Sequence, residues 1–279
     1  MNILVTGGAG FIGSHLVDKL VDEGANVFIL DNLKSGFEKN INEKADFIFG
    51  DIRDEKILYK ALDICDVIYH LAAFTSVPES FTNKEECISI NEVAFKKILS
   101  IAAEKKVKKI ILSSSSAVYP DDQMGPFNES SATSPSSPYG QSKLYDEKIL
   151  YKWCDEQKER SGLALRYFNV YGPRQEADSD YASVIPKFLN KIISEEPIYV
   201  YGDGNQTRDF IYVDDVVSAN MLGLELSSYN LFSVGTGIEY SVNQLVDKIK
   251  KTTDSGITWT HQNVNNIFTD DWHPISFIK

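Results

Sequence analysis

Short apolar runs alternate with longer segments of mixed polarity through the first half of the chain. The runs occupy residues 3–5, 27–30, 46–49, 67–70 and 110–113. After the first run, Ile12, Leu16 and Leu20 recur every four residues, which is typical of one face of a helix. This alternation predicts an α/β fold with a doubly wound parallel sheet, helices on both faces, and ligands at the carboxyl ends of the strands.

The second half of the chain follows a less regular pattern. Ser137-Pro138 has the form of an N-cap followed by proline at the first helical position. The pattern becomes irregular after Gly172-Pro173, and a strand and turn follow near 230–235. Ser241 and Gln244 form a capping box for a further helix. We therefore expect one domain over residues 1–168, to which the strand near 230–235 returns, and a smaller lobe over most of 169–279.

Residues 6–13, TGGAGFIG, join the first predicted strand to the first predicted helix. Their glycines permit positive φ and a close approach of the backbone to a ligand. The helix N-terminus adds free N–H groups and a positive dipole end, which suit a pyrophosphate. A tight connection without a ligand is the alternative. If a dinucleotide binds in a Rossmann-type manner, its contacts here are Gly7, Gly10, Phe11, Ile12 and Gly13.

The second predicted strand ends in Asp31-Asn32, and an acidic side chain at this place can accept hydrogen bonds from an adenosine ribose. No arginine follows Asp31 closely, whereas an arginine there would favour a 2′-phosphate. We therefore expect NAD rather than NADP as the cofactor. Lys34 is the one nearby cation that leaves the choice open.

Composition narrows the partners and the compartment. The chain of 279 residues has 43% hydrophobic and 24% charged residues, as in ordinary globular proteins. Its net charge of −12 argues against nucleic acid or an anionic membrane as a partner. The three cysteines and four histidines show no disulfide or metal-ligand spacing, so we expect no metal. We expect neither a signal peptide nor a transmembrane segment, and we expect a cytoplasmic protein.

Tyr139 and Lys143 stand four residues apart on the helix predicted after Pro138, so their side chains lie on one face. A phenol has a pKa near 10, and stabilising its anion by about three units takes roughly 4 kcal/mol. A lysine about 4 Å away supplies that order of energy at an effective dielectric constant near 20. The pair can therefore form a general base, with the serines from Ser113 to Ser116 offering hydroxyls nearby. An incidental pair on a surface helix is the alternative.

Seven ordered motifs give the chain a specific resemblance. They are TGGAGFIGSHL, GDIRD, HLAA, SSSSAVY, SPYGQSK, RYFNVYGPRQ and GDGNQTRDFIYVDDVV. Together they resemble the extended short-chain dehydrogenases/reductases of the NAD-dependent epimerase/dehydratase family, and most of all its UDP-glucose and UDP-N-acetylglucosamine 4-epimerases. Agreement of seven ordered motifs is far less probable by chance than agreement of one.

The resemblance implies roles for individual residues. Ser115 matches the catalytic Ser/Thr, Tyr139 the catalytic base, and Lys143 the lysine that binds the cofactor ribose. The further cofactor contacts that it implies are Asp51, Ile52, Leu71, Ala72 and Ala73. The substrate contacts that it implies are Ser115, Asn169, Tyr199, Tyr201 and Arg208. For the two tyrosines at 199 and 201, an alternating strand with both rings on one face is an equal alternative.

The implied reaction is epimerisation at C4 of a UDP-hexose or UDP-N-acetylhexosamine through a 4-keto intermediate. Related dehydratases carry an Asp-Glu pair where this chain has Ser116 and Ala117. Related decarboxylases carry glutamate, and reductive epimerases cysteine, where Ala117 stands. These enzymes, or a catalytically silent regulator that binds NAD or a nucleotide sugar, remain the alternatives. The resemblance also implies a homodimer built from the helices that follow Asn91 and Tyr139.

The sequence departs from the family pattern in two ways. Pro120 stands where a glycine usually follows the tyrosine, and no arginine occurs after Arg208, although the family normally supplies one late in the chain. The atypical tail is compatible with three alternatives: a shortened substrate lobe, weaker binding of the nucleotide, or a different activated sugar as the substrate.

Overall fold

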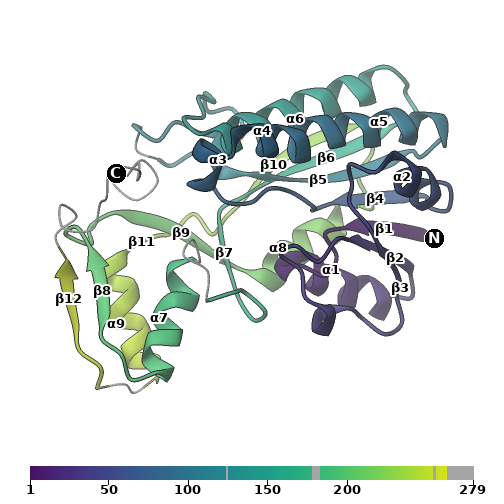
Figure 1. The fold of residues 1–279 in the computed structure, drawn as a ribbon. Helices are drawn as coiled ribbons and strands as arrows, with labels where there is room; N and C mark the ends of the chain where they lie inside the picture. The colour runs from purple at the N-terminus through teal and green to yellow at the C-terminus, as the bar shows by residue number, and fades with distance from the viewer. Residues whose placement is uncertain (124, 178–182, 254–255, 263–279) are drawn as a thin grey trace. The chain divides into compact units, whose positions relative to one another are not determined.

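The computed structural model describes residues 1–123, 125–177, 183–253 and 256–262, and its chain forms two compact units (Figure 1). The first unit contains Met1–Phe168 and Tyr212–Val234. The second contains Asn169–Ile211 and the chain from Gly235 onward. The first unit thus includes residues 212–228 in addition to those of the expected domain. The arginine-free tail from residue 263 lies outside the described residues.

A seven-stranded parallel sheet forms the centre of the first unit, in the order β10-β6-β5-β4-β1-β2-β3. Its strands are β1 (Asn2–Thr6), β2 (Asn26–Asp31), β3 (Asp46–Phe49), β4 (Val67–His70), β5 (Lys109–Ser115), β6 (Ser161–Tyr167) and β10 (Tyr229–Val234). All six pairings are parallel. The predicted α/β class is confirmed, and each of the five apolar runs forms a strand. Near-continuous apolar strands are typical of a sheet that is buried on both faces.

Helices cover both faces of this sheet. They are α1 (Phe11–Asp22), α2 (Glu55–Leu62), α3 (Glu79–Thr82), α4 (Lys84–Ile88), α5 (Ala94–Glu104), α6 (Pro138–Asp155) and α8 (Val213–Leu222). Figure 1 shows α5 and α6 along one face, and α1 and α8 together on the other. The start of α6 is as predicted, because Ser137 Oγ accepts a hydrogen bond of 3.0 Å from Gly140 N and Pro138 opens the helix.

A buried ion pair joins α6 to β6. Arg166 on β6 donates from Nε and Nη2 to the two carboxylate oxygens of Glu147, at 2.9 and 2.8 Å. Both side chains are about 95% buried. Ser114 on β5 also donates to Glu147, and the Tyr119 hydroxyl accepts from Arg166. Such a pair fixes the position of the helix, because either charge alone would be uncompensated in the interior.

His70, the last residue of β4, is buried inside the first unit. Its Nδ1 lies 2.8 Å from Thr6 Oγ1 on the neighbouring strand, and its ring stacks on Phe95. Burial lowers the pKa of His70 to about 3, with a smaller contribution from the charge of Lys143. The imidazole is therefore neutral in the folded protein at physiological pH.

The described residues of the second unit form two small sheets and two helices. Its strands are β7 (Asn169–Tyr171), β8 (Ile198–Tyr201), β9 (Thr207–Tyr212), β11 (Glu239–Ser241) and β12 (Trp259–Gln262), and its helices are α7 (Val184–Ile193) and α9 (Val242–Thr253). The strands pair in the orders β11-β9-β7 and β12-β8. The predicted capping box is present at α9, since Ser241 N donates to Gln244 Oε1 and Gln244 N donates to Ser241 Oγ.

Two features are absent among the described residues, one that would indicate a membrane span and one that would indicate a metal site. Among these residues, no helix combines the length and the apolar character needed to cross a membrane. The same part of the chain holds no group of three or more His, Cys, Asp or Glu side chains placed to bind a metal ion.

Replacing Glu147 with Gln should lower the free energy of unfolding by about 3–5 kcal/mol, because Arg166 then stays buried without its counter-ion. The matched control is Asp63→Asn. Asp63 also accepts from a cation, Lys105, but the two side chains are 63% and 28% exposed. We expect the control to lose no more than about 1 kcal/mol. Urea unfolding of both variants measures the difference, and equal losses would contradict the role given to burial.

Stability should fall in acid partly because of His70. The pKa of His70 in the folded protein lies below the ordinary value of 6.5. Between these two pKa values, the unfolded chain binds a proton at this imidazole and the folded chain does not. Stability from this group is complete above pH 6.5 and is lost as the pH falls toward 3. At two units below 6.5 the loss is about 3 kcal/mol. Urea unfolding of His70→Gln at pH 7 and 4.5 should show a smaller acid loss than the unaltered protein. Parallel pH curves would rule this out.

Candidate functional site

The glycine loop between β1 and α1 brings backbone against backbone. Gly7 has a φ of +73°, and a Cβ on Gly13 would lie only 2.1 Å from the Gly7 carbonyl oxygen. A side chain at either position would therefore open the turn. Helix α1 begins at Phe11, and its N-cap Gly10 has no side chain to cap it. Within the described residues, the amides of Phe11, Ile12 and Gly13 have no acceptor.

These free amides fit the phosphates of a dinucleotide. The first N–H groups of a helix lack partners inside the helix and form the positive end of its dipole. A pyrophosphate supplies the acceptors and the negative charge that such an end favours. The predicted loop residues are thus brought together at the carboxyl end of β1, in the arrangement that the sequence predicts.

Asp31 at the end of β2 is buried and partly hydrogen-bonded. Its Oδ2 accepts from Ala9 N at 3.0 Å, and its Oδ1 accepts from Leu33 N at 2.8 Å. An ionised carboxylate has about four acceptor sites, so each oxygen keeps capacity for one more donor. Two ribose hydroxyls match that capacity. The loop amide of Ala9 fixes the carboxylate next to the glycine turn.

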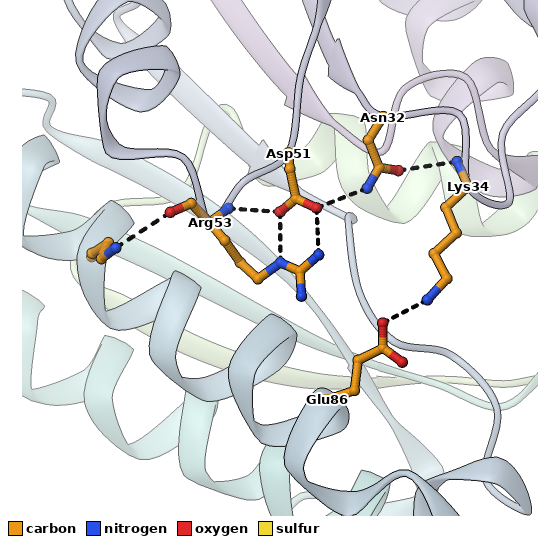
Figure 2. A network of polar contacts seen from close by, with 6 residues as sticks. Asn32, Lys34, Asp51, Arg53 and Glu86 are labelled. Atoms are coloured by element: carbon orange, nitrogen blue, oxygen red, sulfur yellow. Dashed lines mark hydrogen bonds and ion pairs between the residues drawn. The ribbon is translucent and has the colours of Figure 1, made fainter.

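Asp51, by contrast, has its acceptor capacity filled (Figure 2). Arg53 donates to it from its backbone N, Nε and Nη2 at 2.7–2.9 Å, and Asn32 Nδ2 donates at 3.0 Å. The side-chain hydrogen bond from Arg53 is the main reason that the pKa of Asp51 is lowered to about 2. An adenine amino group could use this carboxylate only by replacing one of these donors. Ile52, the neighbouring predicted contact, is buried.

The segment Leu71–Ala73 follows β4 and lies against the glycine turn. Leu71 N donates to the Thr6 carbonyl oxygen at 3.1 Å, and Ala72 N donates to Thr6 Oγ1 at 3.3 Å. A Cβ on Gly7 would lie 2.6 Å from Ala72 N. The predicted residues 71–73 are therefore close to the glycine loop. Thr6 was not predicted, although a hydroxyl residue at a strand end next to the loop was a usable signal.

Ser115, Tyr139 and Lys143 come together where β5 ends and α6 begins. A Cβ on Gly140 would lie 2.3 Å from the Ala117 carbonyl oxygen, so α6 lies directly on the turn after Ser115. Ser115 Oγ accepts from Ala117 N, and the interaction of Ser115 with the Tyr139 phenol lowers the pKa of that phenol. Lys143 Nζ donates to the Ser113 carbonyl oxygen at 2.9 Å and lies 5.9 Å from the centre of the Tyr139 ring.

The electrostatics of Tyr139 differ from the expectation that Lys143 alone acidifies it. Burial raises the pKa of Tyr139 to about 12, and the hydrogen bond with Ser115 offsets only part of this increase. The ammonium of Lys143 is directed to a carbonyl oxygen of β5, and burial lowers the pKa of Lys143. In this structure the phenol is therefore a weaker acid than free tyrosine, because desolvation of the anion outweighs the favourable interaction with Ser115.

Two further residues near this group were missed by sequence reasoning. Asp146, one turn after Lys143, is buried, and its Oδ1 has no hydrogen-bond partner among the described residues. Burial raises the pKa of Asp146, and Lys143 opposes this shift. Asn91 is also buried, and it bonds Phe74 N and Ser142 Oγ, so it ties the segment after β4 to α6. Neither position carries a signal in the sequence alone.

Apart from Ser115, the predicted substrate residues belong to the second unit. Asn169 Nδ2 donates to the Asp209 carbonyl oxygen at 2.9 Å, and Arg208 Nη1 donates to the Thr207 carbonyl oxygen at 2.7 Å. Tyr199 and Tyr201 are 45% and 49% exposed on one face of β8, while Ile198 and Val200 are buried on the other. The alternation is confirmed, and both rings are accessible within this unit.

Comparisons with known proteins agree with this arrangement. The model of the NAD-dependent epimerase/dehydratase family matches residues 3–235. A putative UDP-glucose 4-epimerase of Methanocaldococcus jannaschii is 43% identical over 253 residues, which are 89% of this chain and 81% of that protein.

Two solved structures are also similar. One is the UDP-glucose 4-epimerase of Thermotoga maritima with UDP-glucose, with a TM-score of 0.91 and 37% identity over 94% of this chain and 86% of that chain. The other is the UDP-N-acetylglucosamine 4-epimerase of Methanobrevibacter ruminantium in complex with UDP-N-acetylmuramic acid. Its TM-score is 0.88 and its identity 40%, over 94% of this chain and 85% of that chain.

Replacing Gly13 with Ala should destabilise the protein by about 1–3 kcal/mol and weaken NAD⁺ binding, because the new methyl group meets the Gly7 carbonyl oxygen. Gly256→Ala is the matched control, since a Cβ there meets nothing within 4 Å. Thermal unfolding and calorimetric titration with NAD⁺ measure both effects. The close approach in the loop would be unimportant if the two variants behaved alike.

Proposed function

Because the chain belongs to the NAD-dependent epimerase/dehydratase family, we propose that it is a 4-epimerase of a UDP-linked hexose or N-acetylhexosamine. The observation that carries this proposal is the junction of β5 and α6. There the Ser115 hydroxyl interacts with the Tyr139 phenol and lowers its pKa, one helical turn from the buried side chain of Lys143. The similar solved structures, both 4-epimerases of UDP-sugars, support the assignment.

The residues of the first unit fit the cofactor. The amides of Phe11, Ile12 and Gly13 bind the pyrophosphate, and the spare acceptor sites of Asp31 bind the adenosine ribose. Lys143 donates to the hydroxyls of the nicotinamide ribose in addition to the Ser113 carbonyl oxygen, since an ammonium has three donors. Bound NAD⁺ supplies the hydride acceptor for the reaction and a positive charge near the phenol.

Tyr139 acts as the base that takes the proton of the sugar 4-hydroxyl. Its pKa of about 12 is too high for this task at neutral pH. Positive charge added beside the ring favours the phenolate, so the pKa falls when the site is filled. Ser115 donates a hydrogen bond to the phenolate or to the sugar oxygen and so keeps the reacting oxygens together. C4 would then take the hydride back on its opposite face while the oxygen takes its proton back from Tyr139, which completes the turnover with C4 inverted and the cofactor oxidised again.

Sequence features separate epimerisation from the related reactions. Dehydratases resembling this chain carry an Asp-Glu pair at positions 116 and 117, where this chain has serine and alanine. Neither Ser116 nor Ala117 can serve as the additional acid that dehydration needs. The same alanine replaces the glutamate of the decarboxylases and the cysteine of the reductive epimerases. We therefore propose retention of the sugar skeleton, with the hexose left open.

In the second unit, we propose that Asn169 and Arg208 bind the diphosphate of the substrate. The fork of donors on Arg208 suits phosphate oxygens. The exposed rings of Tyr199 and Tyr201 can stack on the nucleotide base. We also propose a homodimer through α5, α6 and the turn that precedes α5, where Val93 and Tyr151 are each about half exposed.

We expect the protein to convert UDP-galactose or UDP-N-acetylgalactosamine to its 4-epimer, which NMR of the anomeric proton detects. Tyr139→Phe should lower kcat by about 10²- to 10⁴-fold without loss of NAD⁺ binding, because only the base is removed. Tyr145→Phe, on the same helix and six residues on, should leave turnover unchanged.

Three outcomes would contradict the proposal. Unchanged turnover in Tyr139→Phe would remove the base from its role. A 4-keto-6-deoxy product would identify a dehydratase instead. Binding of NAD⁺ without turnover of any nucleotide sugar would favour the silent regulator.

A further inference from the structure

Two cations and two carboxylates alternate beside the end of β2, and Figure 2 shows them in one view. Lys34 Nζ donates to Glu86 Oε1 at 2.6 Å, and Arg53 binds Asp51 through two parallel hydrogen bonds. Asn32 links the two pairs, because its side chain donates to Asp51 and accepts from Lys34 N. These residues come from the segment after β2, the segment after β3, and α4.

Lys34 lies close to Asp31 because the chain turns tightly between them. Leu33 has a φ of +57° and donates its N–H to Asp31 Oδ1, and Lys34 donates its own N–H to Asn32 Oδ1. Two consecutive Asx turns of this kind keep residue 34 next to residue 31. A flexible four-carbon side chain at this position can reach the space in front of the Asp31 carboxylate.

A cation in that space would favour NADP, since a basic residue near the acidic strand end accommodates a 2′-phosphate. The ammonium of Lys34 points toward Glu86 in Figure 2 and donates to its carboxylate. Lys34 is the principal reason that the pKa of Glu86 is lowered, so Glu86 is ionised at neutral pH. Arg53, the other nearby cation, is occupied by Asp51.

The local charge therefore opposes a second phosphate. Lys34 and Arg53 contribute two positive charges, which Asp51 and Glu86 balance, and Asp31 adds a further carboxylate. A 2′-phosphate carries close to two negative charges. In this group of residues both cations are already paired with carboxylates, so the phosphate would be repelled. The 2′-hydroxyl of NAD needs only an acceptor, which Asp31 provides.

We propose that Glu86 is a coenzyme-specificity residue, which favours NAD over NADP by holding Lys34 away from the ribose 2′ position and by adding negative charge near it. The inference rests on the proposed binding of the adenosine ribose at Asp31. It assigns part of the selectivity to α4, an element outside the glycine loop and the acidic strand end. The Lys34–Glu86 pair is exposed, so its effect is electrostatic and sensitive to salt.

The test is calorimetric titration of the cofactor-free protein with NAD⁺ and with NADP⁺. Glu86→Gln should raise the affinity for NADP⁺ by about fivefold to tenfold at low salt, because Lys34 is released and one negative charge is removed. Its affinity for NAD⁺ should change by less than about twofold. Glu85→Gln, which removes an exposed charge from the same helix without an ion pair among the described residues, should change neither affinity.

A second variant separates the two contributions of Glu86. Adding Lys34→Gln to Glu86→Gln should reverse most of the gain for NADP⁺ if the released ammonium binds the phosphate. The gain should also shrink as salt is raised, since the interaction is between exposed charges.

Unchanged binding of NADP⁺ by Glu86→Gln would overturn the inference. So would an equal change for NAD⁺ and NADP⁺, which would mean that the Lys34–Glu86 pair only closes the loop over the cofactor. Failure of the unaltered protein to bind NAD⁺ would overturn the proposed cofactor site and, with it, this inference. Binding of NAD⁺ without the shift in NADP⁺ affinity would overturn the inference alone.

Discussion

The attachment of α6 to β5 and β6 through buried charges determines where the reactive groups lie. Lys143 donates to a carbonyl oxygen of β5, and Glu147 pairs with Arg166 of β6. Both charges are out of water, so the interior tolerates only the arrangement in which each has its partner. Tyr139 precedes these residues on the same helix and is thereby placed beside Ser115. The geometry of the candidate base thus depends on contacts that take no part in the reaction.

The same burial gives the phenol two contrasting properties. It fixes the ring in one place, and it raises the pKa of Tyr139 to about 12 by keeping water from the anion. A tyrosine in this state is a poor base until positive charge enters the site. Asp146, buried one turn beyond Lys143, contributes to the raised pKa of Tyr139, and its Oδ1 has no hydrogen-bond partner among the described residues.

Much of the architecture could be read from the sequence because local rules determine it. Apolar runs gave the five strands, and the caps at Ser137 and Ser241 start helices with the expected hydrogen bonds. The site was less predictable, because its hydrogen bonds and ion pairs join residues that are far apart in the sequence. Thr6 meets Ala72, Asn91 meets Ser142, and Lys34 meets Glu86 52 residues later. No spacing rule relates such partners, and the raised pKa of Tyr139 follows from packing alone.

The seventh strand has a consequence for how the protein is made. Strand β10 completes one edge of the sheet by pairing with β6, yet β7, β8 and β9 lie between them in the sequence. On the ribosome, β6 therefore emerges long before its neighbour and presents unpaired backbone groups throughout that interval. Open edges of this kind invite pairing with other nascent chains. This edge of β6 stays open until the strands β7, β8 and β9 have been synthesised.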